Sequence, residues 1–213
     1  MENQSEQLPP KHTFEEPIII TEPEPWVWNV LAKAFLNDLT LNFWLGEKTN
    51  EESLKDFFEA VIRDVLKSGG TVFSSPNRQV VFIWSWIGRD ATDSNEHKAR
   101  WYEVLEPEGV KRYYWSYEAG DLALDPEKIN KSMEPAYLGV HPDLQGKGYG
   151  SHIFKWTLNY FEKQGYDVPY ILASSRRAAK LYCPLLGFFI HKEVFAAESD
   201  SEPIGVFLKR IRE

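Results

Sequence analysis

The sequence predicts one mixed α/β domain in which helices alternate with short strands. Two segments repeat apolar residues at helical spacing, and several others are short runs of β-branched and aromatic residues. This order of segments, without an internal repeat, is typical of a single layered domain whose sheet is flanked by helices. The chain has 213 residues, of which 43% are hydrophobic, and this suffices for one domain with a buried core.

Two helices are expected after a short β-like run, PIII. Residues 27–35 keep one apolar face, and Thr21 and Glu24 before them have the spacing of a capping box. Residues 54–66 hold a helical period for over three turns, and Asn50 can cap their start. The second helix is the clearest local pattern in the chain.

Residues 71–74 and 79–87 are expected as the two strands of a hairpin around a Ser-Pro-Asn turn. Residues 88–131 show no single period, and we interpret them as an insertion whose aromatic residues favour order. Residues 1–13 are expected to be a flexible polar tail, and residues 14–213 a single domain. The remaining expected elements are strands at 136–140, 170–173, 188–195 and 204–208, and helices at 148–164 and 176–186.

Charge and cysteine content disfavour several functional classes. A nucleic-acid partner calls for a basic surface, whereas the net charge is −8; an amine or a basic peptide is compatible with that charge. The single cysteine, Cys183, can build neither a disulfide framework nor a structural zinc site, which indicates a reducing compartment. No segment has the apolar character of a secretory signal or a membrane span, so we expect a cytoplasmic or nuclear protein.

The stretch VHPDLQGKGYGS, at residues 140–151, predicts an anion site between a strand and a helix. Its glycines allow a sharp turn, and the first backbone N–H groups of the helix lack intrahelical acceptors. A triphosphate-binding loop is excluded because Lys147 stands between glycines, and a dinucleotide loop is disfavoured because Ser151 replaces the third glycine. A tight turn without a ligand is the alternative. Among ligands, one that uses a diphosphate as a handle fits best.

This loop resembles the signature of the GNAT N-acetyltransferase superfamily. The family pattern has Arg or Gln, two variable residues, Gly, one variable residue, and Gly or Ala; residues 145–150 match it, after a Val-His-Pro run. The stretch ILASSRRAAKLYCPLLGFF is similar to the strand, helix, tyrosine and Gly-Phe pair of the family. The resemblance covers residues 17–208 except 88–131. It implies a mixed, mostly antiparallel sheet of six to seven strands, with a V-shaped splay between the strands near 136–140 and 170–173.

The resemblance also implies acetyl-CoA as cosubstrate, an amine as acceptor, and no metal. The strand before the loop would pair with the pantetheine arm, one of its N–H groups would hold the thioester oxygen, and the loop would hold the diphosphate. Ser175 stands where relatives often carry Asn, with a shorter reach towards the pantetheine. The 3′-phosphate would meet Arg176, Arg177 and Lys180, unless these are a solvated helix face. The implied CoA positions are Leu138, Gly139, Val140, Gln145, Gly146, Lys147, Gly148, Tyr149, Gly150, Ser151 and Ser175.

Two residues are implied in catalysis. Tyr182 matches the family tyrosine that protonates the departing thiolate; the alternative is a tyrosine that only packs against the sheet. Glu134 stands where some relatives carry a catalytic base; the alternatives are an exposed carboxylate at the strand end, or a base role filled by a water chain. Pro184 is expected to end or distort the helix just after Tyr182.

The acceptor residues are expected among aromatic side chains. Phe43, Trp44, Trp84 and Trp86 can line a slot, and Trp84 and Trp86 share one strand face; ordinary packing is the alternative. We expect an N-acetyltransferase that acts on a small-molecule amine, as a monomer or homodimer, without a nucleic-acid or membrane partner. The alternatives are a protein or peptide N-acetyltransferase, and a non-catalytic CoA-binding module.

Overall fold

The computed structural model describes residues 14–87 and 95–210, so the expected tail at residues 1–13 lies outside the described part of the chain. Seven strands and six α-helices alternate in this part, with three short 3-10 turns. The elements are β1 (Ile18–Ile20), α1 (Pro25–Phe35), α2 (Leu39–Leu45), η1 (Gly46–Lys48), α3 (Glu51–Lys67), β2 (Thr71–Ser74), β3 (Val80–Trp86), α4 (Asn95–Gly120), η2 (Ile129–Lys131), β4 (Met133–Val140), η3 (Pro142–Leu144), α5 (Tyr149–Lys163), β5 (Tyr170–Ala173), α6 (Arg176–Leu186), β6 (Phe188–Val194) and β7 (Gly205–Arg210).

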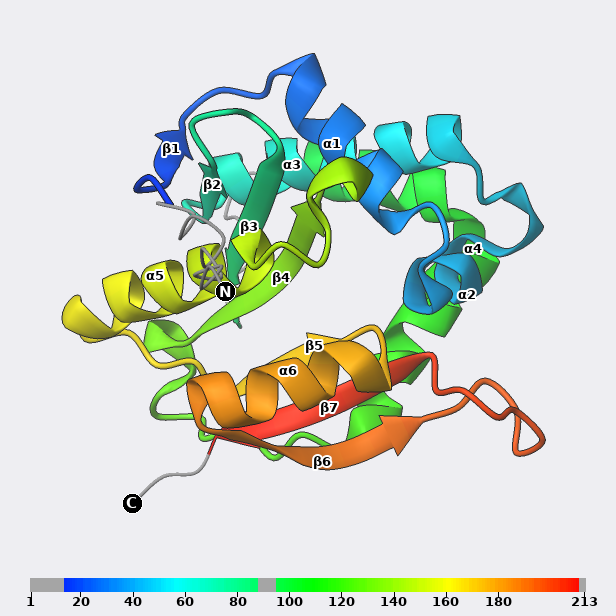
Figure 1. Cartoon of the computed structure of the whole chain (residues 1–213). Coiled ribbons are helices and arrows are strands. Elements are labelled where there is room, and N and C mark those ends of the chain that lie inside the picture. The colour runs from blue at the N-terminus through cyan, green and yellow to red at the C-terminus, as the bar shows by residue number, and fades with distance from the viewer. Residues whose placement is uncertain (1–13, 88–94, 211–213) are drawn as a thin grey trace, which may run out of the picture.

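The strands form two antiparallel sheets rather than one continuous ladder (Figure 1). The first sheet has the order β1-β2-β3-β4, and it contains the hairpin expected at residues 71–87. The second has the order β5-β7-β6. The mixed, mostly antiparallel architecture expected from the sequence is therefore confirmed, but its strands are divided between two sheets.

The two sheets meet at a single point, where β4 and β5 begin. The N–H of Met133 donates to the carbonyl of Asp167 at 2.8 Å, and the N–H of Asp167 donates to the carbonyl of Lys131 at 2.9 Å. Ser132 and Asp167 form an isolated parallel bridge there, after which β4 and β5 diverge (Figure 1). This divergence is the V-shaped splay that the resemblance implied.

In the described part of the chain, helices and sheets enclose three hydrophobic cores, of which two are large. One core lies between the first sheet and α1, α3 and α4, and includes Leu31, Phe58 and Ile83, all fully buried. The other joins α5 and α6 to the strands on both sides of the splay, and includes Trp84 and Phe154. Through this core, α5 and α6 hold the two sheets against each other where β4 and β5 no longer pair.

One helix N-terminus is capped as the sequence predicts, and another is not. Asn50 caps α3 as expected: its side chain accepts the N–H of Ser53 at 3.0 Å, and the Ser53 hydroxyl accepts the N–H of Asn50 at 3.0 Å. The predicted capping box of Thr21 and Glu24 is wrong. Glu24 is the N-cap of α1, but its side chain caps nothing, and Pro25 begins the helix because its fixed φ suits the first turn.

The described part of the insertion consists mainly of α4, two helical halves joined at a break, and ends in η2. In α4, Glu106 has a φ of 59° and precedes Pro107, so the halves on either side follow different axes and no single period runs through the sequence. The C-terminal half reaches the second sheet, where the Tyr117 ring contacts Phe207 at 5.8 Å. Since α4 also packs on α2 and α3, it connects the two halves of the fold.

Two further departures concern short stretches. The helix α2, at 39–45, has seven residues, which are too few for a periodic pattern to be recognised. The expected distortion after Tyr182 does not end α6, since the helix continues through Pro184 to Leu186 and stops at Gly187, whose φ is 72°. A proline so close to the C-terminus removes one hydrogen bond without preventing the last turn.

Gly139 sets how closely α1 approaches β4, and its replacement by Ala is predicted to destabilise the protein. An added Cβ would lie 2.7 Å from Leu31 Cδ2 and 3.2 Å from Ala34 Cβ. Overpacking of this kind typically lowers the free energy of unfolding by about 1–3 kcal/mol. Urea denaturation followed by tryptophan fluorescence measures this. The loss should shrink in a Leu31→Val background, and an unchanged midpoint for Gly139→Ala would contradict the packing argument.

Candidate functional site

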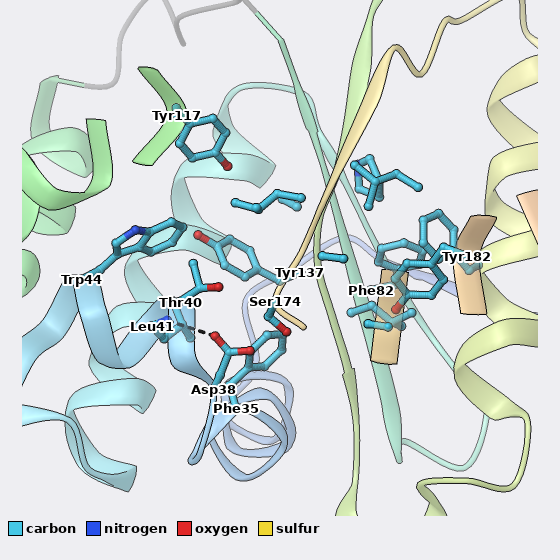
Figure 2. A pocket seen from close by; sticks show the side chains of 18 residues that line it. Phe35, Asp38, Thr40, Leu41, Trp44, Phe82, Tyr117, Tyr137, Ser174 and Tyr182 are labelled. Atoms are coloured by element: carbon cyan, nitrogen blue, oxygen red, sulfur yellow. Dashed lines mark hydrogen bonds between the residues drawn. The ribbon is translucent and has the colours of Figure 1, made fainter. Parts of the chain in front are cut away.

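The splay contains a cavity of about 80 Å³ whose walls come from both sides of the fold. Figure 2 shows Asp38, Thr40 and Trp44 on one side and Tyr182 on the other, with Tyr137 between them. The strands β4 and β5 supply the middle of the wall. The lining residues are Phe35, Asp38, Thr40, Leu41, Trp44, Phe82, Tyr117, Pro135, Ala136, Tyr137, Leu138, Phe154, Ile171, Leu172, Ala173, Ser174, Ala178 and Tyr182.

An open groove of about 460 Å³ adjoins this cavity. It lies between the end of α1, the glycine loop and the turn from β5 to α6, and it brings together Gln145 and Ser175. Asp38 and Ser174 line both the groove and the cavity. The groove and the cavity therefore meet at these two side chains.

The edge of β4 presents backbone groups to the splay. The N–H of His141 donates to the carbonyl of Gln79 at 2.8 Å, so His141 points its backbone groups at β3. The direction of the backbone N–H and C=O groups alternates along a strand. The backbone groups of Leu138 and Val140 therefore point away from β3, towards the splay, whereas those of Gly139 point towards β3. Of the three strand residues expected to hold a ligand through the backbone, two are therefore placed to do so.

A bulge shapes β4 where it borders the cavity. Ile83 pairs with Tyr137 and Trp84 with Pro135, which leaves Ala136 as an extra residue on β4. Pro135, Ala136 and Tyr137 all line the cavity. A bulge turns the strand locally and frees backbone groups from the ladder, which is common beside binding sites.

The glycine loop leads directly into α5. Gly146 and Gly148 have φ values of 75° and 86°, which favour glycine, and a Cβ on Gly146 would meet no atom within 4 Å. Gly148 is the N-cap of α5, and no side chain caps the helix there. The Gln145 side chain donates from Nε2 to the carbonyl of Val140 at 3.0 Å and ties the loop to β4. The first N–H groups of α5, from Tyr149 to Ser151, have no intrahelical acceptors and can bind an anion.

Tyr182 lies in α6 and faces the cavity. Its ring packs edge-on against Phe154, with ring centroids 4.8 Å apart. Burial raises the pKa of Tyr182 to about 12, so the hydroxyl keeps its proton at neutral pH. Within residues 14–87 and 95–210 we find no hydrogen-bond partner for this hydroxyl, which leaves its proton available to a ligand.

Glu134 lies in β4 but is not among the residues that line the cavity. Its carboxylate accepts hydrogen bonds from the Tyr170 hydroxyl and, at 3.2 Å, from the Ser85 hydroxyl. Burial raises the pKa of Glu134, and the two hydrogen bonds oppose that shift. The assignment of Glu134 as a base stays a prediction, because the structure does not bring it together with Tyr182.

Asp38 is the acidic residue that sequence reasoning missed. It is the N-cap of α2, and its Oδ1 accepts the N–H of Leu41 at 3.0 Å (Figure 2). The hydroxyl of Ser174 also hydrogen-bonds its carboxylate, and burial raises the pKa of Asp38 above its ordinary value. The signal in the sequence was an Asp directly before the apolar stretch of α2, a pattern that marks a helix N-cap.

The four expected acceptor residues separate into two groups. Trp44 lines the cavity, and its Nε1 donates to the Ser116 hydroxyl at 3.1 Å. Phe43 does not line the cavity; its ring packs on Trp115, with ring centroids 5.6 Å apart. Trp84 and Trp86 share a face as expected, but that face packs towards α5. Trp84 contacts Phe154 and Phe161 in the core, and Trp86 contacts Tyr166 and donates to the carbonyl of Gly69, so neither lines the cavity.

Of the three basic residues at the start of α6, Arg176 is already engaged. It forms two hydrogen bonds with the carboxylate of Glu193, at 2.8 and 2.9 Å, and a third with the carbonyl of Ser201. Arg177 and Lys180 are exposed. Arg176 therefore fastens α6 to β6, and the other two remain available to an anion.

The described residues contain no group of three or more potential metal ligands. No helix among them combines the length and the apolar composition that a membrane span requires.

Comparison with known proteins gives structural matches. No protein-family model and no curated protein sequence matches the chain. Arylalkylamine N-acetyltransferase 2 from Aedes aegypti is similar in structure, with a TM-score of 0.61 and 16% identity over 92% of this chain and 99% of that one. A Corynebacterium glutamicum protein, "histone acetyltransferase HPA2 and related acetyltransferase", is also similar, with a TM-score of 0.58 and 20% identity over 93% and 98% of the two chains.

Asp38→Asn is predicted to leave stability at pH 7 unchanged or higher. The folded protein holds the Asp38 proton more tightly than the unfolded chain does, in which the pKa of Asp38 is 3.8. The free energy of unfolding therefore falls as pH rises from 3.8 through the raised pKa, and the loss is complete above it. Asn still caps α2 but carries no charge, so it avoids this loss.

The measurement is urea unfolding of both proteins at pH 3.5 and pH 7, with Asp38→Ala as a control. The Ala variant should be less stable than the Asn variant by about 1 kcal/mol at both pH values, because it lacks both the charge and the cap. An Asn variant that is less stable than the wild type at pH 7 but not at pH 3.5 would show that the fold favours the charged carboxylate, contrary to this prediction.

Proposed function

Because the chain has the fold of the GNAT acetyltransferases, we propose that it is an acetyl-CoA-dependent N-acetyltransferase of small primary amines. The observation that carries the proposal is the cavity in the splay, which joins an open groove to the buried hydroxyl of Tyr182. An acyl donor lying in the groove and an amine entering the cavity would meet between β4 and α6.

The residues present fit CoA on three counts. The start of α5 has no side-chain cap, so its N–H groups are available to a diphosphate. The backbone groups of Leu138 and the N–H of Val140 face the splay, where an extended pantetheine arm can pair with them as an added strand would. Gln145 and Ser175 line the groove between these two places. Acetyl-CoA supplies the activated acetyl group when it is bound.

The reaction needs a proton donor for the sulfur that leaves. Tyr182 fits this role because burial keeps its hydroxyl protonated and the hydroxyl faces the cavity. The bulged backbone at Ala136 fits the role of an oxyanion donor, since it lies in the same wall.

A small acceptor is favoured over a protein. The cavity is narrow and its outer wall is aromatic, with Phe35, Trp44, Tyr117 and Tyr137, which suits a compact apolar amine. The similar Aedes aegypti structure is an arylalkylamine acetyltransferase, and such an amine has this character. A peptide amine would have to enter the same narrow space. A CoA-binding module without activity would bind acetyl-CoA but release no thiol with any amine.

Acetyl-CoA is predicted to raise the melting temperature. A ligand at 100 times its dissociation constant stabilises the folded state by about 2.7 kcal/mol, which for a chain of this size corresponds to roughly 5–10 °C. Differential scanning fluorimetry measures this, with ATP at the same concentration as the control, because the loop lacks the spacing for a triphosphate. No shift at millimolar acetyl-CoA would contradict both the enzyme and the CoA-binding module.

Tyr182→Phe is predicted to lower kcat by roughly 10²-fold or more, as expected for the loss of a general acid. The fold and the shift in melting temperature with acetyl-CoA should persist, because the ring still packs on Phe154. Turnover is measured as thiol release with a series of primary amines. Tyr160→Phe, on α5 outside the cavity, is the matched control and should keep full activity. Equal turnover by the wild type and Tyr182→Phe would refute the acid role.

A further inference from the structure

We propose that Asp38 is the residue that binds the ammonium group of the acceptor and takes its proton. This rests on the proposed function, and it names the class of acceptor: a primary amine that arrives as a cation. The carboxylate lies where the groove meets the cavity, so a group bound to it stands between the acyl donor and the aromatic wall.

The first argument is the charge of Asp38. Its carboxylate is held by the N–H groups of Leu41 and Thr40 and by the side chain of Ser174, all of which are uncharged partners. In the part of the chain that the structure describes, no Lys, Arg or His forms a salt bridge with it. A carboxylate removed from water is normally paired with a cation. A bound ammonium would supply the cation that the protein itself does not.

The second argument is the surroundings of Asp38. Phe35, Trp44 and Tyr137 line the same cavity as Asp38 (Figure 2). Aromatic walls suit both the apolar body of an amine and the cation, which is attracted to ring faces. The titratable groups facing this space are Tyr117, Tyr137 and Tyr182, and Lys33 lines the groove. The tyrosines are neutral at pH 7, because burial raises the pKa of each.

The third argument is the comparison with Glu134. That carboxylate is also buried, but Tyr170 and Ser85 occupy it, and it does not line the cavity. Asp38 and Tyr182 line the same cavity from opposite sides. An amine held by Asp38 would therefore have the proton acceptor on one side and the proton donor on the other.

Asp38 and Tyr182 together account for every proton that is transferred in the reaction. The ammonium gives one proton to the Asp38 carboxylate, and the neutral amine forms the C–N bond at the thioester carbonyl. The C–S bond breaks, the electron pair leaves with the sulfur, and Tyr182 gives its proton to that sulfur. The second proton on nitrogen returns to Tyr182, and Asp38 releases its own to solvent. The products are an amide, a free thiol and one proton.

The test uses Asp38→Asn, which keeps the helix cap and the size of the side chain but removes the charge. Binding of 2-phenylethylamine and of its neutral analogue 2-phenylethanol is measured by calorimetry in the presence of CoA. The wild type should prefer the cation, and Asp38→Asn should lose that preference by at least about tenfold. Asp56→Asn, an exposed change on α3, is the matched control and should behave as the wild type.

The second readout is the pH dependence of kcat/KM for 2-phenylethylamine, measured by thiol release. Asp38→Asn should lower kcat/KM by roughly 10²-fold or more and remove the acid limb of the profile, which a capping role alone would not do. Glu134→Gln should keep that limb.

The outcomes separate the two proposals. Two results would overturn the assignment to Asp38. In one, Asp38→Asn keeps the preference for the cation. In the other, the acid limb of the kcat/KM profile is lost in Glu134→Gln and not in Asp38→Asn. A wild type that binds the amine through Asp38 but releases no thiol would overturn the enzyme and leave the binding role supported. A wild type that binds the amine no better than the alcohol would count against Asp38 directly.

Discussion

The arrangement of the site depends on the point where β4 and β5 separate. They are bonded at the bridge between Ser132 and Asp167 and then separate, which leaves one edge of β4 without a strand. Unpaired backbone groups in a protein interior are unfavourable, so an edge of this kind is kept where something else can occupy it. The cavity, the groove and the approach to Tyr182 all follow from that separation, since a closed sheet would fill the same space with hydrogen bonds.

The ionisable side chains of the site lie where burial makes their charged forms unfavourable. Burial raises the pKa of Asp38, Glu134 and Tyr182 alike, so each favours its neutral form more than it would in water. Such groups contribute little to stability, and keeping ionisable side chains where the fold gains nothing from their charge is typical of functional sites. The hydrogen-bond partners of the two carboxylates are uncharged: Tyr170 and Ser85 donate to Glu134, and the Leu41 N–H donates to Asp38.

What the sequence predicted was local, and what it missed depended on contacts between distant segments. The sequence predicted the helix around Phe58, the helix that carries Tyr182, and the glycine loop. Helical periodicity, capping residues and turn residues can be recognised in each because they lie close together in the chain. Alternation placed Trp84 and Trp86 on one strand face, but which core that face meets is decided by the packing of α5. Asp38 was missed because its importance comes from Ser174, far away in the chain.

The long helix α4 has a consequence for how this fold can diversify. It contributes Tyr117 to the cavity and the hydroxyl of Ser116 that holds Trp44, yet no α4 residue lines the groove where the glycine loop lies. Under the proposed function, α4 would therefore contribute to recognition of the acceptor but not to retention of the acyl donor. If the proposed function holds, a chimera that exchanges α4 with the helix of another such protein would change one wall of the cavity and leave the residues of the groove unchanged, so the two sites could evolve separately.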